Sequence, residues 1–385
     1  MRFPEDVPVL ADGAVRLRAH TEEDVDAATE MCQDPEFARW TTVPVPYERR
    51  HAEEFLLETI PAGWRDGGKW SWAIEYDGRF AGNIDMHDGR GDGGEIGFGL
   101  APWARGKGVM TRAVRLLLSF AFDELGWDVM IWRAKTGNWA SRRVAWETGF
   151  RQFVTVRGGM VARGERSDEW VATVRAGEDL EPQGRWLTVP VLENDVVRLR
   201  PLRDDDAERI VEGTGDERTQ HWLSFMPSPY GLAEAHAWLA RTREEVATGS
   251  AVPWAIADPV SDRLLGSVSV FRLGHDGDAE VGYWAHPDAR GKGVVTAAVR
   301  LATGHAFKAE EDGGVGLHRL YLKAAAGNTA SQHVARSTGF QLCGTERDGD
   351  RRRDGSFEGI LTFDLLATDV ANGSGLVESP GDRLR

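Results

Sequence analysis

Near the start of the chain, apolar and polar residues alternate in a way that predicts a strand and then a helix. Val15 and Leu17 alternate with two arginines, which is the period-two pattern of a half-buried strand. The acidic stretch Thr21–Asp24 suits a helix N-terminus, because its side chains cap free N–H groups and face the positive end of the helix dipole. Further on, WSWAIEYDGRFAGNIDMH predicts two strands joined by an Asp-Gly hairpin turn.

The next region predicts a strand, a glycine-rich loop and a helix in succession. EIGFGLA, which begins at Glu95, is typical of a strand, and apolar residues recur at helical spacing from Thr111 onward. The sequence RGKG, Arg105–Gly108, lies between the two. Asp128–Ala134 predicts another strand, and Ser141–Thr148 predicts a helix that a glycine ends. The fold class is therefore α+β, with a mostly antiparallel sheet.

The same series of patterns occurs a second time along the chain. VRLR at Val15 returns at Val197, and WAI at Trp72 returns at Trp254. EIGFGLAPWARGKGVMT returns from Glu280 as EVGYWAHPDARGKGVVT, and NWASRRVAWETGF returns as NTASQHVARSTGF. Because the spacing changes only in loops, the chain is a duplication of a domain of about 180 residues, which is too long a period for a solenoid.

We expect two domains, residues 1–178 and 184–370, followed by a flexible tail at 371–385. The junction falls in a polar stretch, Ala176–Gly184, that contains proline and glycine. The tail contains Gly, Ser and Pro and has no periodicity.

Composition and charge narrow the class of protein. The chain has 385 residues, of which 41% are apolar and 28% charged, as in a soluble globular protein. A net charge of −15 argues against nucleic acid as the main partner, and it is compatible with a cationic acceptor or with an ordinary acidic protein. The sequence contains neither a membrane-length apolar run nor an export signal, and its two cysteines lack metal-ligand spacing. We expect a cytoplasmic protein that contacts no membrane and binds no metal.

The glycine loop predicts a phosphate site. A loop between a strand and a helix N-terminus aims several backbone N–H groups at one point, and glycines let an anion approach them. The alternative is that RGKG is only a tight structural turn with solvated basic residues. The repetition of the same loop in the second half argues against this alternative. A Walker loop is excluded because Lys107 precedes Gly108 instead of Ser or Thr. The dinucleotide fingerprint fails because Pro102 stands where its third glycine belongs.

Two elements in each half carry a resemblance to a known family. They are Arg105–Met110 with Asn138–Phe150, and Arg290–Val295 with Asn328–Phe340. Both halves resemble the GNAT superfamily of acyl-CoA-dependent N-acyltransferases, and most closely the subgroup that acetylates N-terminal amino groups of ribosomal proteins (RimJ/RimL-like). The family's loop has Arg or Gln, two residues, Gly, one residue, then Gly or Ala. The last position of this pattern differs in both halves, because Met110 and Val295 stand where Gly or Ala is usual.

The resemblance implies that acetyl-CoA, or another acyl-CoA, places its pyrophosphate on each RGKG loop and its pantetheine arm along the preceding strand. The cofactor-binding residues implied in the first half are Phe98, Gly99, Leu100, Ala101, Arg105, Gly106, Lys107, Gly108, Val109, Met110, Thr111 and Asn138. Those implied in the second half are Tyr283, Trp284, Ala285, His286, Arg290, Gly291, Lys292, Gly293, Val294, Val295, Thr296 and Asn328.

Transfer to an amine requires a base and a partner for the departing thiol. An amine with a pKa near ~10 must lose a proton before it attacks a thioester. Glu95 and Glu280, just ahead of the cofactor strands, are the candidate bases, and surface ion pairs are the alternative. Many family members donate to the thiol from a tyrosine, but Ala145 and Ala335 stand at that position. The resemblance therefore points to Ser141 and Ser331, for which helix capping is the alternative.

The acceptor is expected to be a protein N-terminus or an amine-bearing small molecule. By resemblance, its site is walled by Trp40 and Tyr47 in the first half, and by Trp222 and Tyr230 in the second. A packed aromatic loop is the alternative. His87 and His275, which we place on turns before the cofactor strands, are possible proton shuttles or solvated loop residues.

Two classes of function stay open at this point. The chain is either an acetyl-CoA-dependent N-acetyltransferase or a non-catalytic acyl-CoA-binding scaffold, and one active domain beside one degenerate domain is also possible. The first half carries five tryptophans that the second lacks, at positions 103, 127, 132, 139 and 146. We expect either a monomer with an internal pseudo-two-fold or a homodimer.

Overall fold

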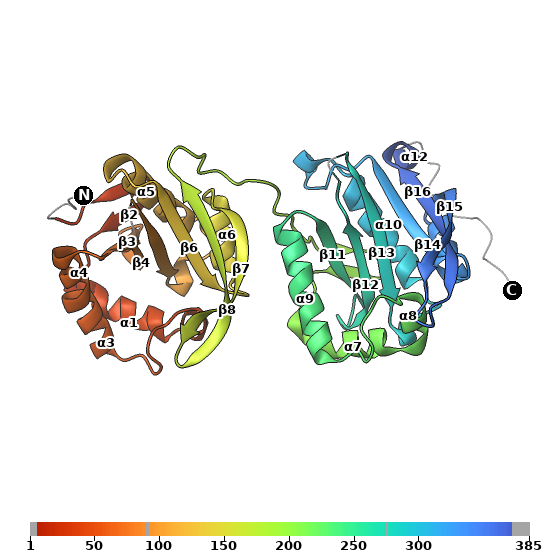
Figure 1. Cartoon of the computed structure of the whole chain (residues 1–385), viewed down its shortest axis with the longest axis horizontal. Helices are drawn as coiled ribbons and strands as arrows, with labels where there is room; N and C mark the ends of the chain where they lie inside the picture. Colours follow the sequence, from red (N-terminus) through yellow and green to blue (C-terminus); the bar gives the residue numbers. More distant parts are fainter. Residues whose placement is uncertain (1–5, 90–91, 275, 372–385) are drawn as a thin grey trace. The chain divides into compact units, whose positions relative to one another are not determined.

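The computed structural model describes residues 6–89, 92–274 and 276–371 (Figure 1). The chain divides into two compact units, Met1–Gln183 and Gly184–Arg385, and each is described by itself. The junction expected at 176–184 includes this boundary. Of the expected tail, all but residue 371 lies outside the described residues. No helix of the described chain is long and apolar enough to cross a membrane.

The N-terminal unit is an eight-stranded sheet in the order β1-β2-β3-β4-β5-β6-β8-β7. All neighbours are antiparallel except β5 and β6, which run parallel. Its strands are β1 Leu10–Asp12, β2 Val15–Arg18, β3 Lys69–Tyr76, β4 Arg79–Asp88, β5 Gly93–Leu100, β6 Val129–Lys135, β7 Arg151–Ala162 and β8 Glu165–Arg175. Its α-helices are α1 Val25–Gln33, α2 Pro35–Trp40, α3 Arg49–Glu53, α4 Ile60–Asp66, α5 Val109–Ser119 and α6 Trp139–Glu147.

The C-terminal unit repeats this design, with the sheet order β15-β16-β14-β13-β12-β11-β10-β9 and one parallel pair, β13 with β14. Its strands are β9 Leu192–Glu193, β10 Arg198–Arg200, β11 Ala251–Ala257, β12 Leu264–Phe271, β13 Asp278–Ala285, β14 Arg319–Ala325, β15 Gln341–Arg351 and β16 Phe357–Leu366. Its α-helices are α7 Ala207–Gly215, α8 Glu217–Trp222, α9 Leu232–Ala247, α10 Val294–Phe307, α11 Thr329–Ser337 and α12 Ala367–Ala371. The predicted α+β class and the tandem repeat are confirmed.

Local patterns explain most of these elements. The predicted hairpin turn is formed by Asp77 and Gly78, whose φ angles of 50° and 73° suit a tight turn between twisted strands. The two predicted helices begin two residues earlier than the apolar pattern suggests, at Val109 and Trp139. Helix ends differ by such margins because capping residues, and not apolar spacing, fix them.

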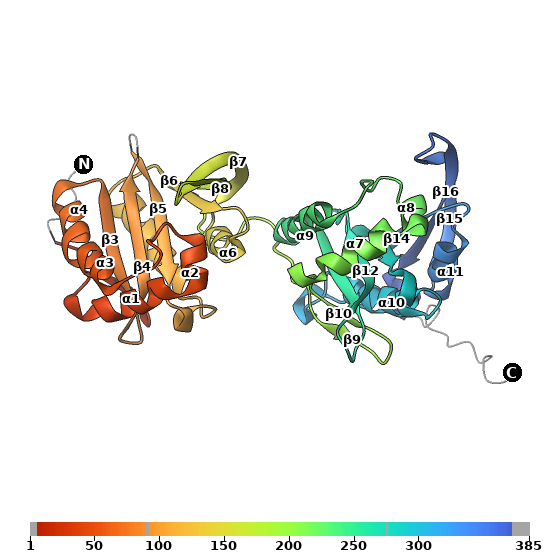
Figure 2. The ribbon, with the colours of Figure 1, turned by 90° about the horizontal axis from the view of Figure 1, so that it is seen from below.

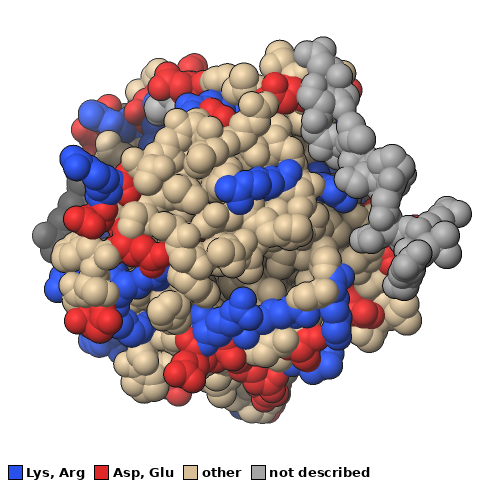
Figure 3. Space-filling model, turned by 90° about the vertical axis from the view of Figure 1, so that its right-hand side faces the viewer, with Lys and Arg blue, Asp and Glu red and all other residues tan. Residues whose placement is uncertain are grey.

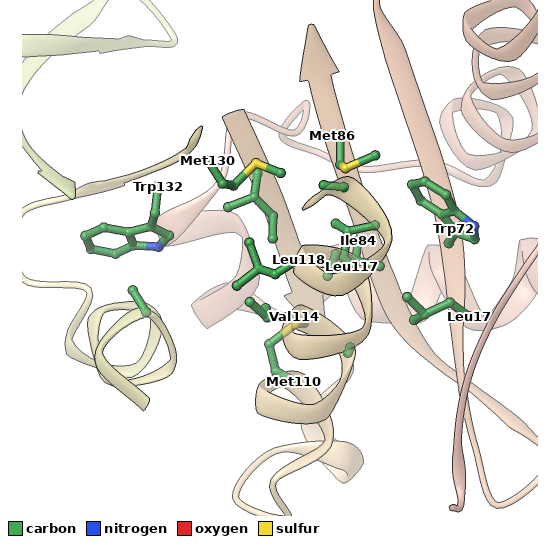
Figure 4. Packing of buried hydrophobic residues seen from close by; sticks show 14 of the residues in the cluster. Leu17, Trp72, Ile84, Met86, Met110, Val114, Leu117, Leu118, Met130 and Trp132 are labelled. Carbon is green, nitrogen blue, oxygen red and sulfur yellow. The ribbon is translucent and has the colours of Figure 1, made fainter. Parts of the chain in front are cut away.

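The core of the N-terminal unit lies between α5 and one face of the sheet. Figure 4 shows Met110, Val114 and Leu117 of α5 beside Ile84 and Met86 of β4, and all five are buried. Burial of each such side chain contributes about 1.5–3 kcal/mol relative to its exposure. Helices α1 to α4 cover the opposite face (Figure 2), where a second buried cluster forms. Because helices pack on both faces of the sheet, α5 and the glycine loop at its start are held in place.

Each parallel pair separates along its length. Strand β5 pairs with β6 only over Gly93–Ile96, while its remaining residues pair with β4 alone. In the C-terminal unit, β13 pairs with β14 only over Asp278–Glu280. Beyond these points the backbone of each central strand has one edge without a ladder partner. This opening lies directly before the glycine loop.

The surface of the C-terminal unit does not carry one sign of charge. On the face drawn in Figure 3, Lys and Arg side chains and Asp and Glu side chains surround a mostly tan area, and a Lys or Arg side chain lies near its centre.

Candidate active site

The glycine loops adopt a conformation that leaves their backbone open. Gly106 and Gly108 have φ angles of 71° and 72°, and Gly291 and Gly293 have 73° and 74°. No heavy atom lies within 4 Å of the point where a Cβ would stand at any of the four. Helices α5 and α10 begin directly after the loops. The positive ends of their dipoles and the free space above the backbone fit a pyrophosphate.

The loop arginines brace the loops. The Arg105 guanidinium lies 2.6 Å from a carboxylate oxygen of Asp34 and donates to the carbonyl of Leu100. In the C-terminal unit, Arg290 bonds Asp216 in the same way. Desolvation alone would raise the pKa of Asp34, but the hydrogen bond and charge of Arg105, together with backbone N–H groups of α2, outweigh it, and the pKa is lowered. Because Asp34 also caps α2, each arginine ties its loop to a helix N-terminus.

Lys107 is the other cation of the first loop, and its ammonium lies 5.4 Å from the ring centre of Trp103. The predicted contact of Arg105, Lys107, Arg290 and Lys292 with a cofactor stays a prediction.

Asn138 and Asn328 act as helix caps. The Asn138 side chain accepts a hydrogen bond from the backbone N–H of Ser141 at 3.2 Å, and Asn328 does the same for Ser331 at 3.1 Å. The asparagines therefore take the capping role that was the alternative for the serines. The serine hydroxyls are left to bond other groups.

Each serine hydroxyl contacts a different aromatic residue. In the N-terminal unit, the indole N–H of Trp132 donates to Ser141 Oγ at 3.0 Å. In the C-terminal unit, Tyr283 Oη lies 2.9 Å from Ser331 Oγ. Sequence reasoning placed Tyr283 along the cofactor strand, but it gave no sign that the phenol meets Ser331. The contact joins residues 48 positions apart, which no local pattern reveals.

The two candidate bases differ in their surroundings. Glu95 forms an ion pair with Arg133 at 3.0 Å, and its side chain is 45% exposed. Glu280 pairs with Arg272 at 2.6 Å, and its side chain is only 12% exposed. Burial raises the pKa of Glu280, although Arg272 and Lys323 oppose this. Glu280 is thus the better proton acceptor of the two.

A cavity of about 1170 Å³ runs through the C-terminal unit. It joins the loop glycines Gly291 and Gly293 to Tyr283, Ser331 and Glu280. We call it the C-terminal cavity. Its volume exceeds the range of roughly 300–1,000 Å³ that is common for small-molecule sites, as an acyl-CoA with an acceptor requires.

The far end of the C-terminal cavity is lined by apolar side chains from α8, α9 and the segment between them. Trp222, Phe225, Met226 and Trp238 are among them. Tyr230 does not line this cavity and packs instead in the cluster beneath α7 and α9.

The N-terminal counterparts lie in different surroundings. Trp40 lines a cavity of about 310 Å³, beside Lys135 and Arg163. Tyr47 is buried in the cluster around α1, so it does not form a wall of this cavity.

Larger side chains occupy the N-terminal positions that correspond to the C-terminal cavity. Leu322 and Thr329 line that cavity, and Trp132 and Trp139 stand at the equivalent places. Thr111, in the first turn of α5, donates to a carboxylate oxygen of Glu147 at 2.8 Å. A carboxylate, which also forms an ion pair with Arg143 at 2.8 Å, therefore stands near the first glycine loop.

One predicted histidine, His87, lies elsewhere than expected, and the predicted cofactor contact of His286 stays a prediction. His87 is inside β4 and not on a turn, and its Nε2 lies 2.6 Å from Asp85 Oδ1. The strand continues because His87 pairs with Glu95 across the sheet. His286 is buried with Nδ1 at 2.7 Å from Asp288 Oδ1, so its side chain serves an ion-pair network. His275 lies outside the described residues.

The fold and this site define a class of protein. A glycine loop at a helix N-terminus, beside a separated parallel strand pair, is built for the pyrophosphate and arm of an acyl-coenzyme A. The chain belongs to the acetyltransferase (GNAT) domain family, whose model matches residues 14–151 and 197–341. It is therefore an N-acetyltransferase that uses acetyl-CoA, as predicted.

Individual relatives match one unit at a time. YdaF of Bacillus subtilis (strain 168), named as a ribosomal N-acetyltransferase, is 31% identical over 165 residues, or 40% of this chain and 84% of YdaF. YjcK of the same organism, named as an N-acetyltransferase, is 27% identical over 163 residues, or 41% of this chain and 87% of YjcK. The structure of Mycobacterium smegmatis RimJ with CoA-disulfide is 23% identical, with a TM-score of 0.41, and covers 48% of this chain and 94% of RimJ.

Proposed function

We propose that the C-terminal unit transfers the acetyl group of acetyl-CoA to the free amino group of a protein N-terminus. The observation that carries this proposal is the C-terminal cavity, which connects the loop glycines with Glu280 and Ser331 in one space. Bound acetyl-CoA supplies an activated acetyl thioester. The loop backbone of Gly291–Gly293 would hold its pyrophosphate, and the open edge of β13 would hold its arm.

Glu280 acts as the general base. A protein α-amino group has a pKa of about 7.7–8, so part of it is protonated at neutral pH and must lose a proton. The raised pKa of the buried Glu280 carboxylate brings it closer to that of the amine, which favours proton transfer. The neutral amine then attacks the thioester carbon directly, without a covalent enzyme intermediate.

Ser331 stabilises the leaving group. Its position at the start of α11 places the hydroxyl in the C-terminal cavity, and the Asn328 cap holds the backbone there. A thiol has a pKa near ~8.5, so its anion needs only a hydrogen bond to depart. A serine hydroxyl provides that bond without giving up its proton.

The acceptor end of the cavity supports a peptide-like amine. Trp222, Phe225, Met226 and Trp238 offer apolar contacts for the first side chains of a protein, and Phe225 is 79% exposed. The name of the relative YdaF, a ribosomal N-acetyltransferase, points in the same direction.

The N-terminal unit is proposed to be the less active or inactive copy. Its serine and its loop glycines are present. However, Trp132 and Trp139 put larger side chains at the positions that line the cavity in the other unit, and the Glu147 carboxylate lies near the loop. Its candidate base, Glu95, is exposed and paired with Arg133. One active and one degenerate copy is therefore the arrangement that these contacts favour.

A matched pair of variants tests the proposal. Glu280→Gln should lower kcat/KM for an N-terminal peptide by at least about 100-fold, because general base catalysis contributes about 10²–10⁴-fold. Glu95→Gln, the same change in the other unit, should leave the rate within about twofold. The assay follows CoA thiol release with peptides and with small amines. An unchanged Glu280→Gln rate would overturn the role of Glu280, and a preference for small amines would overturn the acceptor.

A further inference from the structure

Tyr283 holds the hydroxyl of Ser331 from the side of the central strand. Its Oη lies 2.9 Å from Ser331 Oγ and 3.2 Å from the Ser331 carbonyl oxygen. The ring is partly buried and lines the C-terminal cavity. Burial also raises the pKa of Tyr283 to about 12, so the phenol keeps its proton at every pH at which the enzyme works. It is therefore a permanent hydrogen-bond donor.

The N-terminal unit shows the same arrangement built from another residue. There Trp132 Nε1 lies 3.0 Å from Ser141 Oγ, and an indole nitrogen only donates, so Ser141 is the acceptor. Phe98 stands at the position of Tyr283, and Leu322 stands at the position of Trp132. Each unit thus has one aromatic hydrogen-bond partner for its serine hydroxyl, supplied from β13 in one case and from β6 in the other. In the N-terminal unit that partner can only donate, and the phenol of Tyr283 is able to do the same.

We propose that Tyr283 is a positioning residue that directs the Ser331 proton toward the thioester sulfur. When the phenol donates to Ser331 Oγ, the serine proton must point to another acceptor. The cavity holds that acceptor when acetyl-CoA is bound. A hydroxyl that accepts one hydrogen bond is also a stronger donor in the next one. The inference rests on the proposed transfer in the C-terminal unit.

The chemical step balances without a further reagent. The ammonium proton passes first to the Glu280 carboxylate, which returns it to water. The neutral amine nitrogen then bonds to the thioester carbon as the C=O π pair moves to oxygen, and the second N–H proton passes to Glu280. The oxygen pair then re-forms the C=O bond and expels the sulfur. When the C–S bond breaks, its electron pair stays on sulfur. The thiolate accepts a hydrogen bond from Ser331 Oγ, and Ser331 accepts one from Tyr283, so neither hydroxyl loses its proton. The thiolate takes a proton from water after it departs.

The second contact of the phenol gives the competing arrangement. If Tyr283 donated to the Ser331 carbonyl instead, the serine proton would point at the phenol oxygen and away from the sulfur. A negative thiolate in the cavity stabilises the productive arrangement, because only that arrangement gives it a donor. Removal of the phenol hydroxyl alone therefore distinguishes the two.

The test is Tyr283→Phe, which removes the hydroxyl, keeps the ring and introduces the residue type that the N-terminal unit has at the equivalent position. We expect kcat to fall about tenfold, the loss of one hydrogen bond made stronger in the transition state, while KM for acetyl-CoA stays within about twofold. Ser331→Ala should lower kcat by at least as much. The double variant should be no slower than Ser331→Ala, because Tyr283 acts only through the serine. Tyr76→Phe makes the same change at a tyrosine of β3 in the other unit, which stacks on Trp103, and as a control it should leave kcat unchanged.

Three results would overturn the inference. They are an unchanged kcat in Tyr283→Phe, multiplied losses in the double variant, or a rise in KM with kcat intact, which would mean that the ring only packs. A loop-blocking variant, Gly293→Trp, separates this failure from that of the proposed function. If Gly293→Trp retains full transfer, the reaction is not in the C-terminal unit and both proposals are rejected. If Gly293→Trp is inactive and Tyr283→Phe is normal, only the role of Tyr283 is rejected.

Discussion

At the scale of single residues, the same motif residue has different neighbours in the two units. Glu95 and Glu280 occupy equivalent positions, yet the side chain of Glu95 is 45% exposed beside Arg133, and that of Glu280 is 12% exposed beside Arg272. The difference arises from the partner strand, where Lys323 stands in place of Arg133 and pairs with Glu346. A glutamate that keeps its place in the motif can therefore lose or gain a chemical role through its neighbours.

The raised pKa of Glu280 predicts a specific pH dependence. A general base works only when it is deprotonated, so kcat/KM should fall as the pH drops through the pKa of Glu280. Because burial raises that pKa, the loss should begin at a higher pH than it would for an exposed glutamate with a pKa near ~4.3. Because protonation of the peptide amine also lowers kcat/KM, the pH profile is measured for the native enzyme and for Glu280→Gln with the same peptide. Only a limb that the variant lacks belongs to Glu280, and acid limbs of the same shape in both proteins would contradict the assignment.

His20 predicts a pH effect on stability that is separate from activity. Burial lowers the pKa of His20 to about 4, so the folded N-terminal unit keeps the imidazole neutral. Between about pH 6.5 and that value the unfolded chain binds a proton that the folded chain does not, and stability falls as the pH falls. His20→Gln should therefore reduce the drop in unfolding free energy between about pH 7 and 5, measured in urea. An equal drop in both proteins would show that His20 does not contribute.

At the scale of elements, the helix that carries each serine depends on one asparagine. Asn328 and Asn138 bond the N–H of the serine three residues later, at 3.1 and 3.2 Å. Loss of such a cap costs about 1 kcal/mol and loosens the first turn of the helix. The cap is thus a link between stability and the position of the catalytic hydroxyl.

Asn328→Ala and Asn138→Ala should therefore have equal effects on stability and unequal effects on activity. Each should lower the free energy of unfolding by about 1 kcal/mol in urea titrations. Only Asn328→Ala should also lower kcat, because only α11 carries the serine that takes part in transfer. A fall in kcat with Asn138→Ala would assign activity to the N-terminal unit.

The helices, strands and loops follow from local sequence patterns, but the side-chain contacts between them do not. The Asp77-Gly78 turn, the glycine loops and the helices after them were all predicted from short stretches of sequence. The contact between Tyr283 and Ser331 was not, because it depends on how far β13 and β14 separate. The brace from Arg105 to Asp34 was also missed, since it joins residues 71 positions apart. Pairings of this kind are set by the packed sheet and not by neighbours along the chain.

At the scale of the whole molecule, the chain is a tandem of two folds that have diverged by exchange of side-chain volume. Where the C-terminal unit has Trp284, the N-terminal unit has Gly99, and Phe37 lies against that glycine. A larger residue on a strand is offset by a smaller one on the helix that packs against it, as Trp284 lies against Gly213, so both units stay filled. Such exchanges of side-chain volume leave the fold unchanged, but they change the shape of a cavity.

The central claim is that transfer occurs in the C-terminal unit, and blocking one loop at a time tests it most directly. A tryptophan in place of Gly108 or Gly293 fills open space above a backbone with positive φ, where a pyrophosphate would lie. With acetyl-CoA and an N-terminal peptide, Gly293→Trp should abolish CoA release, and Gly108→Trp should retain it within about twofold. Full activity in Gly293→Trp, with loss in Gly108→Trp, would contradict the account.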